Sequence, residues 1–175
     1  MKISSLAVVI MFILNISNAY SGEWQSRHHS INIKYNDKNW KIIQTQDEED
    51  DTIVALFDKS DGSSFYARVE SLDDALEIED LDLESALASS LYNSDPDVRF
   101  IERDQVIIGG LNFHYDDYQF NNKKFGSQTV RHAFLKKKNH VIILLFSWPH
   151  DMPIAKEKKF PVKHLAFVEG VRIGG

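Results

Sequence analysis

Residues 111–148 read LNFHYDDYQFNNKKFGSQTVRHAFLKKKNHVIILLFSW, and this stretch decides the fold. Apolar and aromatic residues alternate with polar ones over 111–120 and 125–135, which is the period of a half-buried β-strand. The polar runs NNKK and KKKN that follow these segments predict turns. Residues 141–146 (VIILLF) are continuously apolar. We therefore expect the last strand to lie in the middle of an antiparallel sheet, with both of its faces covered.

The sequence before this stretch extends the sheet. Residues 52–57 (TIVALF) and 64–69 (SFYARV) flank an Asp61-Gly62 pair, and Asp-Gly supplies the positive φ that a tight hairpin requires. Residues 30–35 (SINIKY) alternate in the same way, and residues 98–108 form another strand region that ends at a glycine pair. Each of these segments predicts a strand.

Two helices are expected besides the strands. Leu83, Leu87 and Leu91 are spaced along one helical face and predict a helix from about residue 82 to 93. A second helix is expected near the C-terminus, with Pro161 in its first turn. Its apolar stripe consists of Val162, Leu165, Val168 and Ile173. Strand runs with helices in the middle and at the end indicate the α+β class.

This order of elements resembles the PsbP-like family. The residues that carry the resemblance are Ile31, Ile33 and Trp40, the hairpin at Asp61-Gly62, the helix from Leu83 to Leu91, the strand ending in Ile107-Ile108-Gly109, and the meander with the C-terminal helix. The resemblance covers residues 28–174 and implies an α/β/α sandwich around a central antiparallel sheet. It does not imply an enzyme, since the family's known members mostly bind other proteins or assist assembly. Some exported bacterial proteins with this kind of fold are immunity proteins, which is an analogy at the level of the fold.

The N-terminus has the pattern of a secretory signal peptide. Lys2 precedes nine consecutive apolar residues, Leu6 to Leu14, and Ser17-Asn18-Ala19 supplies small residues for cleavage after Ala19. A membrane anchor would need about 20 apolar residues. We therefore expect residues 1–19 to be removed and residues 20–175 to form a single domain in the periplasm or outside the cell. The sequence contains no Cys, so this exported domain must be stable without disulfides.

The acidic residues suggest a partner surface. The chain carries 26 Asp and Glu against 20 Lys and Arg, a formal net charge of −6, which argues against binding to nucleic acid. Five of the carboxylates are consecutive: Asp47, Glu48, Glu49, Asp50 and Asp51. We expect them to form a solvated loop that binds a basic protein partner. Trp148 and His150 are the other predicted contact residues, because a loop at a strand end would display them.

A second acidic stretch, residues 73–84, raises the alternative of calcium binding. It has the length of an EF-hand loop, but Ile78 replaces the glycine of the sharp turn and Ala75 replaces a ligand. Asp73, Asp74 and Glu77 remain candidates for an irregular calcium site, although a solvated acidic surface is the commoner interpretation. His114 and His132 could share a ligand only if the strand register makes them neighbours.

The sequence contains no recognisable catalytic motif. Asp116 and Asp117 are adjacent on a predicted strand and should point to opposite faces, so without a bulge they would not serve one substrate together. Hydrolysis by these carboxylates with His114 and His132 is the weakest hypothesis. The preferred one is an exported, non-enzymatic protein that binds another protein, with no cofactor. A narrower version makes it an immunity or inhibitor protein that uses its acidic loops, and the alternative is an envelope protein that binds calcium or a small ligand.

Overall fold

The computed structural model describes residues 21–71, 98–137 and 139–174. The expected signal peptide, the helix predicted over residues 82–93 and the calcium candidates Asp73, Asp74 and Glu77 lie outside the described residues. Within the described part of the chain, no helix is long and apolar enough to span a membrane.

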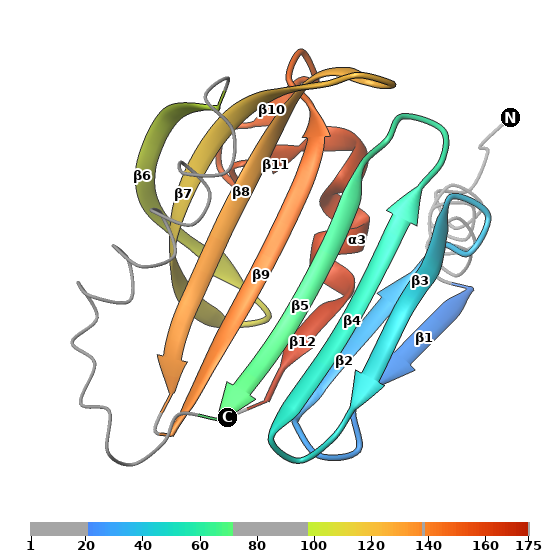
Figure 1. The fold of residues 1–175 in the computed structure, drawn as a ribbon. Helices are drawn as coiled ribbons and strands as arrows, with labels where there is room; N and C mark the ends of the chain where they lie inside the picture. Colours follow the sequence, from blue (N-terminus) through green and yellow to red (C-terminus); the bar gives the residue numbers. More distant parts are fainter. Residues whose placement is uncertain (1–20, 72–97, 138, 175) are drawn as a thin grey trace, which may run out of the picture.

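A seven-stranded antiparallel sheet dominates the structure (Figure 1). Its strands, in spatial order, are β3 (Trp40–Asp47), β4 (Asp51–Asp58), β5 (Ser64–Ser71), β9 (His140–Pro149), β8 (Gly126–Lys137), β7 (Leu111–Asn122) and β6 (Arg99–Ile108). The expected middle position of the VIILLF strand is confirmed, because β9 has three strands on either side. Its even-numbered residues from Ile142 to Trp148 are buried, whereas Ile143 and Leu145 on the other face are half-buried.

A second layer covers one face of this sheet. It contains β1 (Gly22–Gln25), β2 (Ile31–Tyr35) and β12 (Val171–Ile173), which pair in that order. Beside them lie the 3-10 turn η1 (Val162–His164) and the helix α3 (Leu165–Gly170), and Figure 1 shows α3, β2 and β12 together behind the sheet. A short pair, β10 (Ile154–Ala155) and β11 (Phe160–Pro161), leads into η1. The architecture is α+β, as predicted.

The C-terminal helix is shorter than predicted, and the assignment of Ile173 to its stripe is wrong. Val171 and Ile173 are buried and Arg172 is exposed, so residues 171–173 alternate with the period of a strand. This strand pairs antiparallel with β2, where Ile173 lies opposite Ile31. Pro161 precedes η1 rather than lying inside the helix.

Aromatic side chains join the two layers. The Trp40 ring stacks on Phe167 of α3 with ring centroids 4.4 Å apart, and Phe167 meets Phe65 edge-on at 5.1 Å. Phe146 of β9 packs against Phe160 at 4.9 Å. Such pairs stabilise a core beyond the area that they bury, so they fix the C-terminal segment on the sheet.

The predicted hairpin at Asp61-Gly62 is confirmed between β4 and β5. Gly62 has a φ of +80°, and a Cβ atom at this position would lie 2.3 Å from the Phe125 ring. Gly126 has a φ of +74°, but a Cβ atom there would meet nothing within 4 Å. The two glycines share the backbone constraint and differ in the space around them.

We expect Gly62→Ala to lower the free energy of unfolding more than Gly126→Ala. The left-handed backbone costs both variants about 1–2 kcal/mol, whereas displacement of the Phe125 ring adds about 1–3 kcal/mol for Gly62→Ala alone. Urea unfolding of the two variants measures the difference. Equal losses would show that the ring moves without cost.

Candidate functional site

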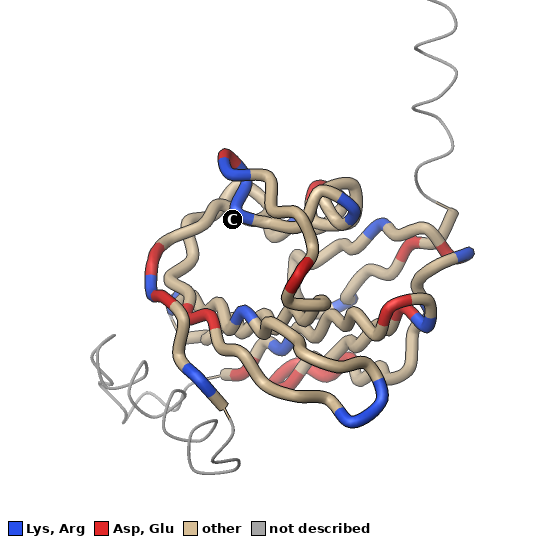
Figure 2. The backbone as a smooth tube through the Cα atoms, turned by 90° about the horizontal axis from the view of Figure 1, so that it is seen from above, with Lys and Arg blue, Asp and Glu red and all other residues tan. Residues whose placement is uncertain are grey.

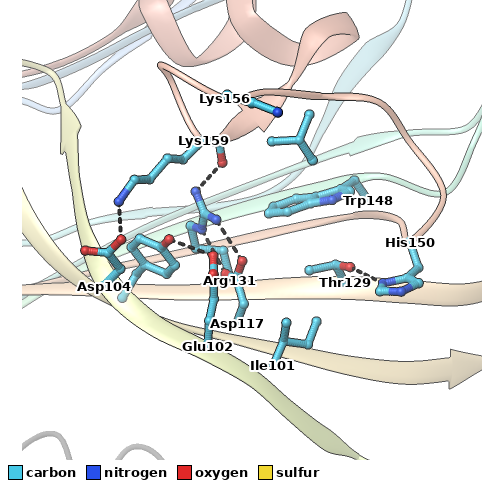
Figure 3. Close-up of a pocket in the computed structure, with 12 residues that line it drawn as sticks. Ile101, Glu102, Asp104, Asp117, Thr129, Arg131, Trp148, His150, Lys156 and Lys159 are labelled. Atoms are coloured by element: carbon cyan, nitrogen blue, oxygen red, sulfur yellow. Dashed lines mark hydrogen bonds and ion pairs between the residues drawn. The ribbon is translucent and has the colours of Figure 1, made fainter.

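A hollow of about 370 Å³ lies between the core-facing side of β6 to β9 and the segment that contains β10 and β11 (Figure 3). Strands β6, β7, β8 and β9 supply its floor, and the roof comes from Ile154, Lys156 and Lys159. Apolar and charged side chains meet in it, which is typical of a binding site whose polar groups orient the ligand.

An ion pair lies at the bottom of this hollow. The Arg131 guanidinium donates from Nε and Nη2 to the two carboxylate oxygens of Asp117, at 2.8 and 2.7 Å. Both side chains are almost fully buried, with 3% and 6% exposed. Neighbouring strands place the two residues directly opposite each other, because Asp117 of β7 pairs with Arg131 of β8.

Aromatic rings surround the guanidinium. Its Cζ lies 3.8 Å from the ring centroid of Tyr115, 4.8 Å from that of Phe160 and 5.4 Å from that of Trp148. Its Nη1 donates to the backbone carbonyl of Lys159, which has a positive φ of 58°. Arg131 thus holds the roof segment on the sheet through a bidentate ion pair, contacts with aromatic rings and a hydrogen bond to a backbone carbonyl. A lysine side chain could not make all three contacts.

Three of the other charged side chains of the hollow, Glu102, Asp104 and Lys159, also have partners. The Tyr115 hydroxyl donates to Glu102 at 2.8 Å, and Lys159 pairs with Asp104. Burial raises the pKa of Tyr115, so its hydroxyl stays protonated at neutral pH. These groups stabilise the walls, and none of these contacts leaves a free base poised for proton transfer.

The rim is apolar on both sides. Ile101 of β6 is 42% exposed, and Ile154 of the roof is 43% exposed. Deeper in the hollow, the buried Thr129 hydroxyl lies 2.8 Å from Nδ1 of His150. A ligand entering between the two isoleucines would contact apolar surface first and hydrogen-bonding groups afterwards.

The prediction that a loop displays Trp148 is wrong. Trp148 belongs to β9 and is only 2% exposed. It follows the inward alternation of Ile142, Leu144 and Phe146, and its ring forms a wall of the hollow (Figure 3). His150 is exposed, as expected, and lines the same hollow.

The structure corrects the view of residues 47–51 as a wholly solvated loop. Asp47 ends β3 and accepts hydrogen bonds from the Ser26 hydroxyl at 2.6 Å and the Arg27 amide at 2.7 Å. Asp51 begins β4 and pairs with Arg68 at 2.8 Å. Three of the five candidates remain exposed at the β3–β4 turn, namely Glu48, Glu49 and Asp50.

The two groups of predicted contact residues do not come together. Asp51 lies opposite Glu70, which pairs with Val141, whereas Ser64 at the other end of β5 pairs with Ser147. The acidic turn and the hollow therefore occupy opposite ends of the sheet, about 20 Å apart along β9. Charges of both signs are spread around the described trace (Figure 2), so local groups of residues matter more than an overall acidic face.

His114 and His132 do not form a directly opposed pair. They lie on neighbouring strands, but His114 pairs with Phe134, and His132 pairs with Asp116. The Phe134 ring lies near both imidazoles, with centroids 6.0 and 6.3 Å away. The opposite orientation expected for adjacent carboxylates is confirmed, because Asp116 pairs with Arg103 and Asp117 with Arg131.

Comparison with known proteins shows the fold. No family model matches the sequence, and no curated protein does. The solution structure of cyanobacterial PsbP (CyanoP) from Synechocystis sp. PCC 6803 matches with a TM-score of 0.57 and 10% identity, covering 89% of this chain and 94% of that one. This chain has a PsbP-like fold. The Ran-binding protein Mog1p of Saccharomyces cerevisiae matches with a TM-score of 0.47 and 10% identity, covering 87% and 94% of the two chains.

In this PsbP-like fold, sequence reasoning missed Arg131 and its site. The segment TVRHAFL places the charged Arg131 among neighbours that are buried in β8. A charge within such a strand is the sequence signal of a buried ion pair. The partner of Arg131 lies 14 residues away on the preceding strand, and finding that partner requires the β7–β8 register.

We expect Arg131→Met to lower the free energy of unfolding by about 3–5 kcal/mol, because it leaves the Asp117 carboxylate buried without its partner. Arg68→Met, which removes the half-exposed partner of Asp51, should cost less than about 1 kcal/mol. Chemical unfolding measures both values. Replacing Asp117 by Leu in the Arg131→Met background should recover much of the loss, and equal effects of the two single variants would contradict the argument.

Burial of His132 predicts a loss of stability in mild acid. Burial lowers the pKa of His132 from 6.5 to about 4, so the unfolded chain binds more protons between these pH values. The free energy of unfolding should therefore fall as the pH drops from 6.5 toward 4. Between pH 7 and pH 5 the wild type should lose about 2 kcal/mol more than His132→Gln, measured by urea unfolding at both pH values. Parallel pH profiles would contradict this assignment.

Proposed function

We propose that this protein is exported and binds another protein without catalysing a reaction, and that the partner docks along β6. The observation that carries the proposal is the edge position of β6 beside two hollows. Within the described part of the chain β7 is the one strand that pairs with β6, which lies at the margin of the sheet. The Lys159 ammonium donates to the Gln105 carbonyl of β6 at 3.1 Å. An extended segment of a partner can add to such an edge through main-chain hydrogen bonds.

The side chains of β6 suit this mode of binding. Most of the strand is exposed, and three of its exposed residues are large and apolar: Phe100 at 46%, Ile101 at 42% and Ile107 at 72%. Natural edge strands are usually protected from such pairing. The apolar side chains exposed on β6 therefore indicate a surface that a partner protein covers.

The hollows supply specificity. Ile101 borders the hollow that contains Arg131, and Ile107 borders another of about 540 Å³ against Lys158 and Lys159. Strand addition places alternate partner side chains on one face. Side chains entering the two hollows would then fix the register of the partner.

The same geometry supports binding over catalysis. The Thr129 hydroxyl lies beside the His150 imidazole, as a nucleophile lies beside its general base in some enzymes. Among the described residues, however, His150 makes no side-chain contact with a carboxylate that would orient it. Asp104, Asp117 and Glu102 are each engaged by another side chain.

The narrower proposal concerns the partner. A signal peptide at residues 1–19 would direct export to the periplasm or outside the cell, where the partner would be a secreted toxin or an envelope protein. Glu48, Glu49 and Asp50 would attract a basic surface on it and increase the association rate. This acidic turn lies at the other end of the sheet from the hollow, so it would steer a large partner rather than contact the segment bound at β6.

A photo-crosslinking amino acid tests the docking edge. Placed at Ile107 in the exported protein, it should give a covalent adduct with a specific envelope or secreted protein in the native host. The matched control is Ile43, which is 64% exposed on β3 at the opposite edge of the sheet. Ile101→Asp should remove the adduct formed from position 107, because a charge at the apolar rim opposes entry of the partner.

Adducts from position 43 alone, or from neither position, would overturn docking along β6. If the partner is a toxin, co-expression of the wild type should protect sensitive cells and Ile101→Asp should not. Adduct formation without protection would reject the immunity version and leave the binding edge established.

A further inference from the structure

A second group of side chains meets where the β4–β5 hairpin touches η1. Asp58 ends β4, Asp61 lies in the turn and His164 ends η1. One ligand atom from each of these three residues lies within 4.8 Å of the others. The His164 Nε2 is 3.8 Å from Oδ2 of Asp61.

Two of these groups are buried without hydrogen-bond partners. The Asp58 side chain is 1% exposed, and its Oδ2 accepts no hydrogen bond. The His164 side chain is 6% exposed, and its Nε2 has no partner either. A buried polar atom without a hydrogen bond costs free energy, so a ligand that contacts both atoms would offset this cost.

The surrounding contacts orient the three groups. The Ser60 amide and hydroxyl donate to Oδ1 of Asp58 at 2.8 and 2.6 Å, and the Ser63 amide donates to Oδ1 of Asp61 at 2.8 Å. Each carboxylate therefore keeps its Oδ2 toward the centre. The Trp40 ring meets the His164 imidazole edge-on at 5.5 Å.

A cation already occupies part of this site. The Lys163 ammonium pairs with Oδ2 of Asp61 and lies 3.6 Å from Oδ2 of Asp58. It is 44% exposed on a flexible stem, so it can turn into solvent. Lys163 shows that the carboxylates attract positive charge, and the unpartnered Nε2 of His164 shows that the ammonium does not complete the site.

We propose that Asp58, Asp61 and His164 bind a zinc ion, which displaces the Lys163 ammonium. One imidazole nitrogen with two carboxylate oxygens suits zinc, whereas calcium and magnesium prefer oxygen ligands alone. The protein supplies three ligands and leaves a fourth position for water or a group from another molecule. Zinc at this point joins the hairpin to the segment that precedes α3.

Zinc binding is tested with tag-free protein that has been treated with a chelator. Calorimetry with zinc chloride should give one ion per chain, and zinc should raise the midpoint of thermal unfolding. Asp58→Asn and His164→Gln should each weaken binding by at least about tenfold. The matched control is His28→Gln, which removes an exposed imidazole elsewhere and should leave the zinc affinity unchanged.

Lys163→Ala distinguishes a zinc site from an internal ion-pair cluster. It removes the competing ammonium, so it should raise the zinc affinity. If Lys163 is simply the counter-charge of the two carboxylates, the same variant should lower stability without any gain in zinc affinity. This variant keeps the proposal testable even if Asp58→Asn fails to fold.

Cobalt replaces zinc as a spectroscopic probe. Its visible absorption should change when Co²⁺ binds the wild type and should change differently with His164→Gln. Absence of zinc binding, or binding that survives Asp58→Asn and His164→Gln in folded protein, would overturn the proposal. Tighter binding of calcium than of zinc in parallel titrations would overturn the assignment of the metal.

Discussion

The buried ion pair between Asp117 and Arg131 is the constraint on which the two candidate sites depend. Removing two charges from water is costly unless the geometry between them is good and their remaining donors find partners. Here the fork of Arg131 meets both carboxylate oxygens, and its third donor reaches the Lys159 carbonyl. The register between β7 and β8 places Arg131 opposite Asp117, and the backbone of the roof segment supplies the Lys159 carbonyl. The pair therefore links β7 and β8 to a segment far away in the sequence.

This link positions more than the hollow around it. The Lys159 carbonyl fixes the backbone immediately before Phe160, whose ring is 1% exposed and packs on Phe146 and Arg131. Pro161 then leads directly into η1, which carries Lys163 and His164. The roof of the hollow and the proposed zinc ligand His164 thus belong to one continuous segment. The Arg131 guanidinium and its aromatic neighbours hold this segment on the sheet, together with the ion pairs of Lys159 and Lys163.

Sequence patterns predict the elements whose signal lies within a few residues. The hairpin at Asp61-Gly62 follows from local turn chemistry, and the middle position of β9 follows from VIILLF. The predicted C-terminal helix is too long because Leu165 and Ile173 are spaced as on one helical face, although Val171-Arg172-Ile173 also fits a strand. Pairing with Ile31 and Ile33 decides between the two, and that pairing spans almost the whole chain.

The environments of individual candidate residues depend on register, which explains why the sequence did not predict those of Trp148, Asp47 and Asp51. Trp148 is displayed or buried according to which face of β9 meets the second layer, and a shift of one residue would exchange the two. Leu144 and Phe146 lie on the same face of β9 as Trp148 and are buried with it. The acidic run misleads for a related reason. Asp47 ends β3 and Asp51 begins β4, and they accept hydrogen bonds from Ser26 and Arg68. Composition predicts full solvation for these carboxylates, whereas strand pairing supplies them with donors.

The arrangement of the two sites also bears on whether they can communicate. Coupling between sites requires an element with two arrangements that both ligands bias. The segment from Lys159 to His164 is the physical connection here, but Arg131, Phe160 and the core aromatics hold its first part in one position. Close packing of this kind resists small displacements. A zinc ion that moves only the exposed Lys163 side chain leaves this anchored part in place, so the packing favours independent binding at the hairpin and at β6.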